Sequence, residues 1–148
     1  MNDDISQSVC YLDTNIFVYM HDGNEVEKRS VSNRLYKSFL RTGRGRIAVQ
    51  VIAEWRNTMV RKFPHFVTKE ERRRFMRLLE VWNPLVITPL IIMKAEELCD
   101  HYHLSPYDSV HVQCALEQNC RYFLSEDMQD GLIVNNTLTF RNPYKTSS

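Results

Sequence analysis

The chain has no long apolar segment and no recognisable export signal. No stretch approaches the number of apolar residues that is needed to cross a bilayer. The first seven residues, MNDDISQ, are acidic and polar, whereas a signal peptide needs positive charge followed by an apolar run. The sequence therefore predicts a cytoplasmic protein that does not bind membranes.

Paired cysteines are also absent. The four cysteines, at positions 10, 99, 114 and 120, form no Cys-x-x-Cys pair and no zinc-like grouping with histidine. Cys10 and Cys114 lie in apolar segments of regular period. We interpret all four as buried thiols of a reducing compartment.

A strong charge of either sign is missing too. The formal net charge is +1 at pH 7, so any attraction to nucleic acid must come from local clusters of basic residues. The 148 residues are 43% hydrophobic and 25% charged, and they contain no internal repeat. These values predict one globular domain over residues 1–148, with frayed ends at residues 1–7 and 145–148.

Short apolar runs alternate with stretches of helical period, which predicts an α/β fold around a mostly parallel sheet. Strands are expected at residues 9–13, 46–49, 85–87 and 121–125, with an edge strand at 138–141. Helices are expected at residues 25–41, 50–62 and 106–118, after the capping box of Thr68 and Glu71, and from Pro89. The last two should bury the apolar faces Phe75, Leu78, Leu79 and Trp82, and Ile92, Ala95, Leu98, Cys99 and Tyr102.

The segment YLDTNIFVYM, residues 11–20, runs an apolar strand into Asp13, which is followed by Thr14 and Asn15. Open α/β sheets bind their ligands where a strand ends and a turn leads into a helix, so Asp13 is a candidate metal ligand. The alternative is that Asp13 or Asn15 only caps a helix that begins near Ile16.

Further carboxylates follow other predicted strands or begin helices: Glu54, Asp108, Asp127 and, close behind, Asp130. Each has a structural alternative. Glu54 fits a solvated helix acid, although it lies beside an apolar stripe. Asp108 fits a helix cap with Ser105, and Asp127 fits a turn.

The joint arrangement of these acids carries more weight than any one of them. The carboxyl ends of parallel strands meet at one edge of a sheet, so the acids should converge there. Clustered carboxylates repel one another unless a hard divalent cation compensates their charge. This predicts one or two Mg²⁺ or Mn²⁺ ions, and the lack of paired cysteines or His-x-x-x-His disfavours zinc.

Three segments together resemble the PIN-domain ribonuclease family, most closely the VapC-like toxins of toxin-antitoxin pairs. They are YLDTNIFVYM, RIAVQVIAEWRNTMVRK and SPYDSVHVQCALEQNCRYFLSEDMQDG. The resemblance implies a three-layer α/β/α domain with a central sheet of four to five strands. It places the family's metal-binding acids at Asp13, Glu54, Asp108 and Asp127, with Asp130 as the alternative or supporting last acid. Asn15 and Ser125 would orient these ligands or a water.

The same resemblance implies metal-dependent hydrolysis of RNA that leaves a 5′-phosphate and a 3′-hydroxyl. It also implies a cognate antitoxin that places a basic side chain in the acidic groove, and a homodimer. Trp55, Met59 and Phe63 would supply apolar dimer contacts, or else belong to the core.

Basic residues near the acids are candidates for binding substrate phosphates. Arg56, Arg61 and Lys62 share the predicted helix of Glu54, so we expect them to contact RNA. His111 follows Asp108 by one helical turn, and we interpret it as a packed or orienting residue in preference to a general base.

Other functions remain open at this stage. The same fold could serve a housekeeping RNA-processing or DNA-directed nuclease, or a module that binds RNA or protein without turnover. A phosphoryl-transfer site like that of receiver domains is weakened because no Asp-x-Asp pair follows the first strand. A serine nucleophile is disfavoured because the chain has no Gly-x-Ser-x-Gly elbow.

Overall fold

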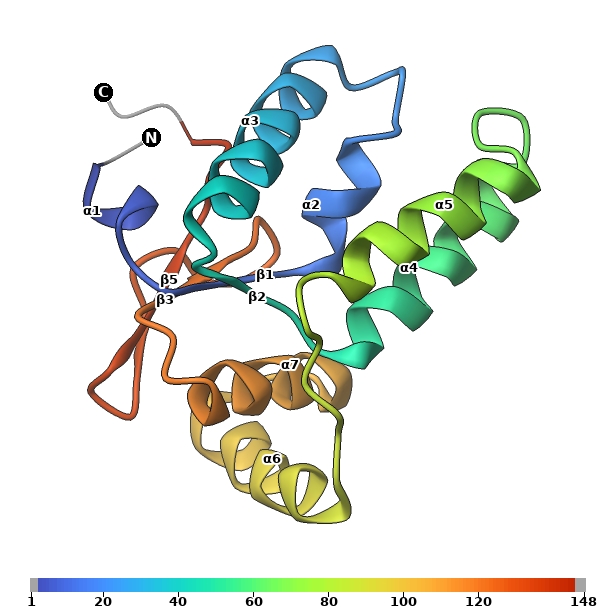
Figure 1. Ribbon diagram of the computed structural model, residues 1–148. Coiled ribbons are helices and arrows are strands. Elements are labelled where there is room, and N and C mark those ends of the chain that lie inside the picture. Colours follow the sequence, from blue (N-terminus) through green and yellow to red (C-terminus); the bar gives the residue numbers. More distant parts are fainter. Residues whose placement is uncertain (1–2, 146–148) are drawn as a thin grey trace.

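A single five-stranded sheet organises the computed structural model, which describes residues 3–145 (Figure 1). Its strands are β1 (Cys10–Leu12), β2 (Gly45–Arg46), β3 (Tyr122–Leu124), β4 (Ile133–Val134) and β5 (Leu138–Arg141). They lie in the order β2-β1-β3-β5-β4, and every pair is parallel except β4 with β5. The predicted mostly parallel α/β sheet is confirmed.

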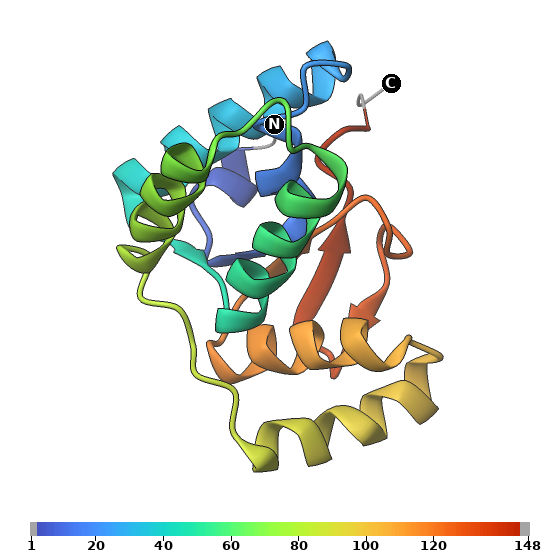
Figure 2. The same ribbon diagram turned by 90° about the vertical axis from the view of Figure 1, so that its right-hand side faces the viewer.

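Helices cover both faces of this sheet. They are α1 (Asp3–Ser6), α2 (Thr14–Tyr19), α3 (Val26–Thr42), α4 (Val49–Lys62), α5 (Lys69–Glu80), α6 (Pro89–Tyr102) and α7 (Pro106–Glu117). Figure 1 shows α2 and α3 on one side of the strands and α7 and α6 on the other. Figure 2 shows α6 and α7 side by side beneath the sheet, and α4 beside α5. The arrangement is the predicted three-layer α/β/α fold.

Three strand predictions need correction. The strand expected at residues 46–49 is shorter and begins one residue earlier, as β2, and Val49 already belongs to the helix that follows it. The strand expected at residues 85–87 is reduced to a single parallel bridge between Leu85 and Ala48. The strand at residues 138–141 is present as β5, but it lies inside the sheet because β4 pairs with its outer side. With only two residues, β4 is too short to show the alternating pattern by which strands are predicted.

The helix ends follow their sequence signals, but two apolar faces are rotated from the predicted ones. Thr68 and Glu71 form the reciprocal capping box of α5, and Gly43 ends α3 with φ at 70°. On α6 it is Ile91 that is buried, whereas Ile92 is 53% exposed. Leu78 on α5 is also exposed, because a helix of this length needs only one narrow stripe against its neighbour.

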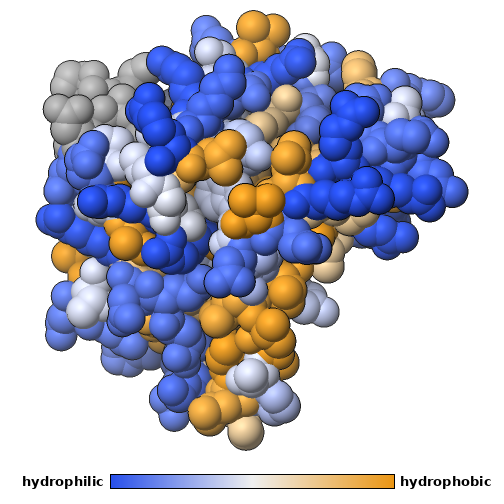
Figure 3. All heavy atoms as spheres, viewed as in Figure 1, coloured by the Kyte–Doolittle hydropathy of each residue, from blue (hydrophilic) through white to orange (hydrophobic). Residues whose placement is uncertain are grey.

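The candidate dimer contacts belong mostly to the core. Trp55 and Met59 on α4 are fully buried, and Phe63 is half-buried. Their side chains are therefore not available as an apolar surface. Exposed apolar residues gather instead over the link from α5 to α6 and over α6, as Figure 3 shows. They are Val81, Val86, Leu90, Ile92 and Met93.

The cysteines were predicted to be buried thiols, and the chain ends were predicted to be frayed. All four cysteines are free thiols, and only Cys99 is not fully buried. Residues 1–2 and 146–148 of the expected frayed ends lie outside the described residues. Next to them, α1 is an ordered helix because Ile5 is buried in the core and Asp4 pairs with Arg121 at 2.9 Å. Within residues 3–145 no helix is long and apolar enough to span a membrane.

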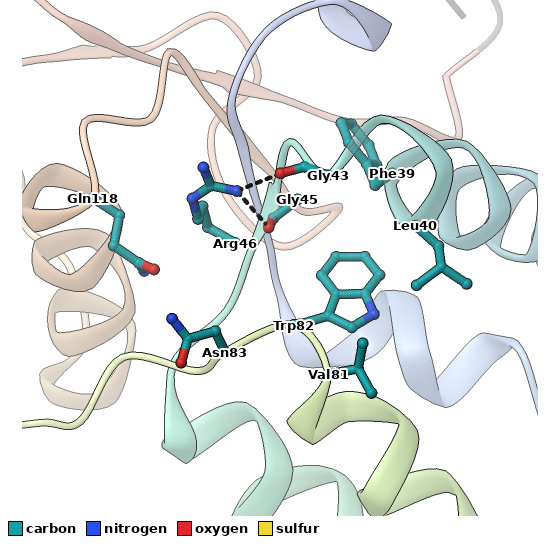
Figure 4. Close-up of a pocket in the computed structure, with 9 residues that line it drawn as sticks. All are labelled: Phe39, Leu40, Gly43, Gly45, Arg46, Val81, Trp82, Asn83 and Gln118. Atoms are coloured by element: carbon teal, nitrogen blue, oxygen red, sulfur yellow. Dashed lines mark hydrogen bonds between the residues drawn. The ribbon is translucent and has the colours of Figure 1, made fainter.

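A hollow of about 390 Å³ opens at the amino ends of the strands, beside Gly45 (Figure 4). It is lined by Phe39, Leu40, Gly43, Gly45, Arg46, Val81, Trp82, Asn83 and Gln118. The guanidinium of Arg46 donates to the carbonyls of Gly43 and Gly45, which holds it at one wall. No carboxylate lines this hollow, so it is not the site predicted from the acids.

Replacing Gly45 by alanine is expected to destabilise the protein by about 1–3 kcal/mol, the usual effect of overpacking. A Cβ at Gly45 would lie 2.2 Å from Cζ3 of the nearly buried Trp82 ring. Urea unfolding measures the change. The matched control is Gly23→Ala, whose Cβ would meet nothing closer than 3.8 Å. Equal stability of the two variants would contradict the close packing.

Candidate metal centre

The predicted acids meet in a cleft of about 260 Å³ at the carboxyl ends of β1 and β3. Its lining consists of Asp13, Thr14, Asn15, Glu54, Asn57, Thr58, Asp108, His111 and Asp127. The lining residues come from α2, α4, α7 and the loop after β3, all of which reach this edge of the sheet. The structure thus brings together four of the five candidate acids.

Asp13 directly follows β1 and is the N-cap of α2, so the predicted helix cap is present at a residue that also lines the cleft. Its Oδ1 accepts a hydrogen bond from the Thr14 backbone N–H, and its Oδ2 accepts one from Ser125 Oγ, each at 2.8 Å. Burial raises the pKa of Asp13, although His111, Ser125 and Thr14 act in the opposite direction. The ionised form of this carboxylate therefore lacks full compensation within the protein.

Glu54 lies on α4, which begins three residues after β2 ends. Its Oε1 accepts hydrogen bonds from Thr14 Oγ1 and His111 Nε2, both at 2.7 Å, and its Oε2 accepts one from Gln50 Nε2 at 2.8 Å. Burial disfavours the charged form, but the contacts with His111, Thr14 and Gln50 outweigh it and lower the pKa of Glu54 to about 2. Glu54 is a fixed, ionised carboxylate.

His111 connects this site to the core. Only 2% of the residue is exposed, its Nε2 donates to Glu54, and its Nδ1 shares a hydrogen bond of 2.7 Å with the hydroxyl of Tyr11. Burial acts to lower the pKa of His111, but Glu54 and the charges of Asp13 and Asp108 outweigh it and raise that pKa. The sequence indicated an orienting role for this residue, but nothing in it indicated Tyr11 as a partner.

Asp127 is held over the cleft by the two residues predicted to orient the acids. Asn15 Nδ2 donates to Asp127 Oδ2 at 2.5 Å. Ser125 Oγ accepts from the Asp127 backbone N–H at 3.2 Å and donates to Asp13. Burial, helped by the charges of Glu126 and Asp108, raises the pKa of Asp127. Ser125 thus links the Asp13 carboxylate to the Asp127 backbone, and Asn15 fixes the Asp127 carboxylate.

The remaining acids, Asp108 and Asp130, have different positions. Asp108 lies in the first turn of α7, where its backbone N–H donates to Ser105 Oγ at 3.3 Å, and its side chain lines the cleft. Asp130 is absent from the cleft lining. Its carboxylate accepts from the Asn142 backbone N–H at 2.8 Å and lies 3.7 Å from Lys145 Nζ. Of the two candidates for the last acid, Asp127 is the one in the cleft.

Residues 10–129 match the PIN domain family, which is most of the chain and includes every residue that lines the cleft. The chain belongs to the PIN domain family. PIN domains are typically nucleases that use divalent metal ions. No curated protein gives a significant match to the chain.

The cleft fits the divalent metal of a PIN domain. One ligand atom each from Asp13, Glu54 and His111 lies within 4.8 Å of the others, and Asp108 and Asp127 line the same cleft. Among these lining residues there is no lysine or arginine, so His111 is the one side chain there that can carry positive charge. A bound divalent cation would supply the missing compensation for the clustered carboxylates.

The predicted phosphate-binding residues of this PIN domain lie outside the cleft on α4. Arg56, Arg61 and Lys62 are all exposed. Residues seven apart share a helix face, so Arg61 extends the face of Glu54 by two turns. Arg56 is two residues from Glu54 and points to the other side of the helix. Arg61 is therefore better placed than Arg56 to contact the phosphates of a substrate strand that extends out of the cleft.

Proposed function

We propose that this PIN domain is a Mg²⁺- or Mn²⁺-dependent endoribonuclease and the VapC-type toxin of a toxin-antitoxin pair. The observation that carries the nuclease assignment is a cleft lined by four carboxylates and by no lysine or arginine. Such a cleft repels a phosphodiester unless a divalent cation is bound. Hydrolysis of RNA and the toxin role rest on the resemblance of three long segments to VapC-like proteins.

In this proposal Asp13, Glu54, Asp108 and Asp127 would hold the metal. When bound, the metal neutralises charge on the scissile phosphate and lowers the pKa of an attacking water. Glu54 is ionised and fixed by three donors, so it can orient that water by accepting a hydrogen bond from it. Asn15 and Ser125 hold the Asp127 and Asp13 carboxylates by hydrogen bonds and so orient these two acids.

Arg61→Ala is expected to weaken RNA binding and to reduce its dependence on salt, whereas Arg56→Ala serves as the matched control. Loss of one phosphate contact lowers the slope of log K against log salt by about 0.7 for a single strand. Fluorescence anisotropy with a labelled, non-cleavable RNA analogue in the presence of Mg²⁺, at several salt concentrations, measures both quantities without cleavage. Equal RNA affinity and equal salt dependence in the two variants would show that the RNA backbone does not run along this face of α4.

We propose further that a cognate antitoxin inhibits the enzyme with an arginine or lysine side chain inserted among the carboxylates. The charge of the cleft supports this, because a cation there satisfies the same oxygens as the metal and excludes substrate. A homodimer is proposed from the resemblance alone. Its contacts would have to avoid Trp55 and Met59, because both are buried in the core.

Cleavage of a mixed RNA pool and of single-stranded DNA, with Mg²⁺, Mn²⁺ or EDTA, tests the proposed function. Metal-dependent cutting of RNA to products with 5′-phosphates is the expected result. Preferential cutting of DNA would favour the DNA-directed alternative. Binding of metal and RNA by the folded protein without any cutting would favour a non-catalytic binding module.

A further inference from the structure

The contacts of His111 raise a question about the role of this residue in the metal centre. Its ring lies close enough to Asp13 and Glu54 for all three residues to hold one ion, since their ligand atoms lie within 4.8 Å of one another. Imidazole is a common ligand of transition metals and suits iron, nickel, copper and zinc best. The hydrogen bonds of the ring indicate a different role.

Both ring nitrogens of His111 already have partners inside the protein. Nε2 donates to Glu54 Oε1 at 2.7 Å, and Nδ1 shares a hydrogen bond of 2.7 Å with the Tyr11 hydroxyl. A metal bound to either nitrogen would have to replace one of these hydrogen bonds. With 2% of the residue exposed, the ring also has little room to turn toward the cleft.

Tyr11 fixes the ring from behind. Its residue is fully buried on β1, and its ring stacks on Phe123 of β3, with centroids 5.1 Å apart and planes inclined by 15°. The hydroxyl of Tyr11 is therefore held by the centre of the sheet. The hydrogen bonds of His111 with Tyr11 and with Glu54 connect this rigid part of the sheet to the Glu54 side chain, which is flexible and lies on a helix.

We propose that His111 is a positioning residue that fixes Glu54 Oε1 with support from Tyr11, and that it is not itself a metal ligand. Glu54 then receives three donors, from His111, Thr14 and Gln50, and is held in one orientation. This deepens and rests on the proposed nuclease function, because a fixed carboxylate is useful where water must be aligned with a phosphate.

The test compares the wild type with His111→Gln, His111→Leu and Tyr11→Phe, using Mn²⁺ as the probe. Glutamine can place an N–H donor near the position of Nε2, whereas leucine fills the space without a donor. Calorimetric titration measures Mn²⁺ affinity, pulsed electron paramagnetic resonance detects nitrogen bound to Mn²⁺, and thermal melting checks the fold. Steady-state cleavage of a labelled RNA separates kcat from KM.

We expect kcat of His111→Leu to fall by about 10- to 100-fold, the usual effect of removing a group that orients a metal-site residue. His111→Gln should recover most of this loss, and Tyr11→Phe should show a smaller one, with KM unchanged in all three. The spectrum of the wild type should show no nitrogen coupling from a bound imidazole.

Three results would overturn the proposal. Nitrogen coupling in the wild type, with Mn²⁺ binding lost in both His111 variants, would make His111 a ligand. Equal kcat in His111→Gln and His111→Leu would reduce it to a packing residue. If the wild type binds Mn²⁺ but cuts no RNA, the proposed function is wrong, while the spectrum and the affinities still decide whether His111 is a ligand. A folded wild type that binds no Mn²⁺ would overturn both proposals.

Discussion

Asp13→Asn is expected to reduce metal-dependent cleavage about a thousandfold, because a metal contributes several kcal/mol and each 1.4 kcal/mol is tenfold in rate. The variant should keep its fold. Asparagine has the shape of aspartate, and its amide can accept from the Thr14 backbone N–H and donate to Ser125 Oγ, the two groups that Asp13 now contacts. Quantitative cleavage of a labelled RNA measures the loss.

The matched control is Asp100→Asn, which makes the same substitution at an exposed position on α6, on the outer side of the helical layer. This variant should cut RNA like the wild type. An Asp13→Asn protein as active as the wild type would rule out Asp13 as a ligand and end the assignment of this cleft as the metal centre.

The second large effect is that bound metal should reverse the order of the melting temperatures of the wild type and Asp13→Asn. Without metal, Asp13→Asn should melt at or above the temperature of the wild type at pH 7. With Mn²⁺ at a hundred times its dissociation constant, the wild type should gain about 2.7 kcal/mol and melt at the higher temperature. Differential scanning fluorimetry with and without EDTA measures both states.

The direction of the stability difference without metal follows from the pKa of Asp13, which burial raises above its ordinary value of 3.8. A group with a raised folded-state pKa binds its proton more tightly when folded, so the protein loses stability as pH rises through 3.8 toward the folded pKa. Asparagine removes this penalty. Metal binding needs the ionised carboxylate, so the stabilisation by Mn²⁺ should fade as pH is lowered into the acidic range. A Mn²⁺ effect that is equal in wild type and variant would place the metal elsewhere.

The sequence was sufficient to predict a mostly parallel sheet and the edge of it at which the acids gather. Asp13 follows an apolar run, and the alternation of strands and helices predicts parallel pairing, so Asp13 and the loop after β3 had to meet. The predicted contact of Ser125 with the acids is a direct hydrogen bond in the structure. The meeting of the acids could be inferred from local patterns and one rule of topology, whereas the role of Ser125 was implied by the resemblance to the PIN-domain family.

What the sequence did not reveal depends on packing between distant residues. The choice between Ile91 and Ile92 on α6 depends on how the helix is rotated against α7, which one apolar pattern does not determine. The hydrogen bond of Tyr11 with His111 joins residues 100 positions apart, and aromatic residues on buried strands usually only fill space. Neither the rotation of α6 nor the hydrogen bond of Tyr11 with His111 can be inferred from the spacing of residue types along the sequence.

The strand order of the sheet also determines when the cleft first exists. Ser125 and Asp13 are 112 positions apart, and β3 must pair with β1 before the loop that carries Asp127 can reach Asp13. A chain still under synthesis, with β3 not yet made, has no assembled cleft. For the proposed ribonuclease, this order of assembly means that cutting can begin only once nearly the whole domain has left the ribosome and folded.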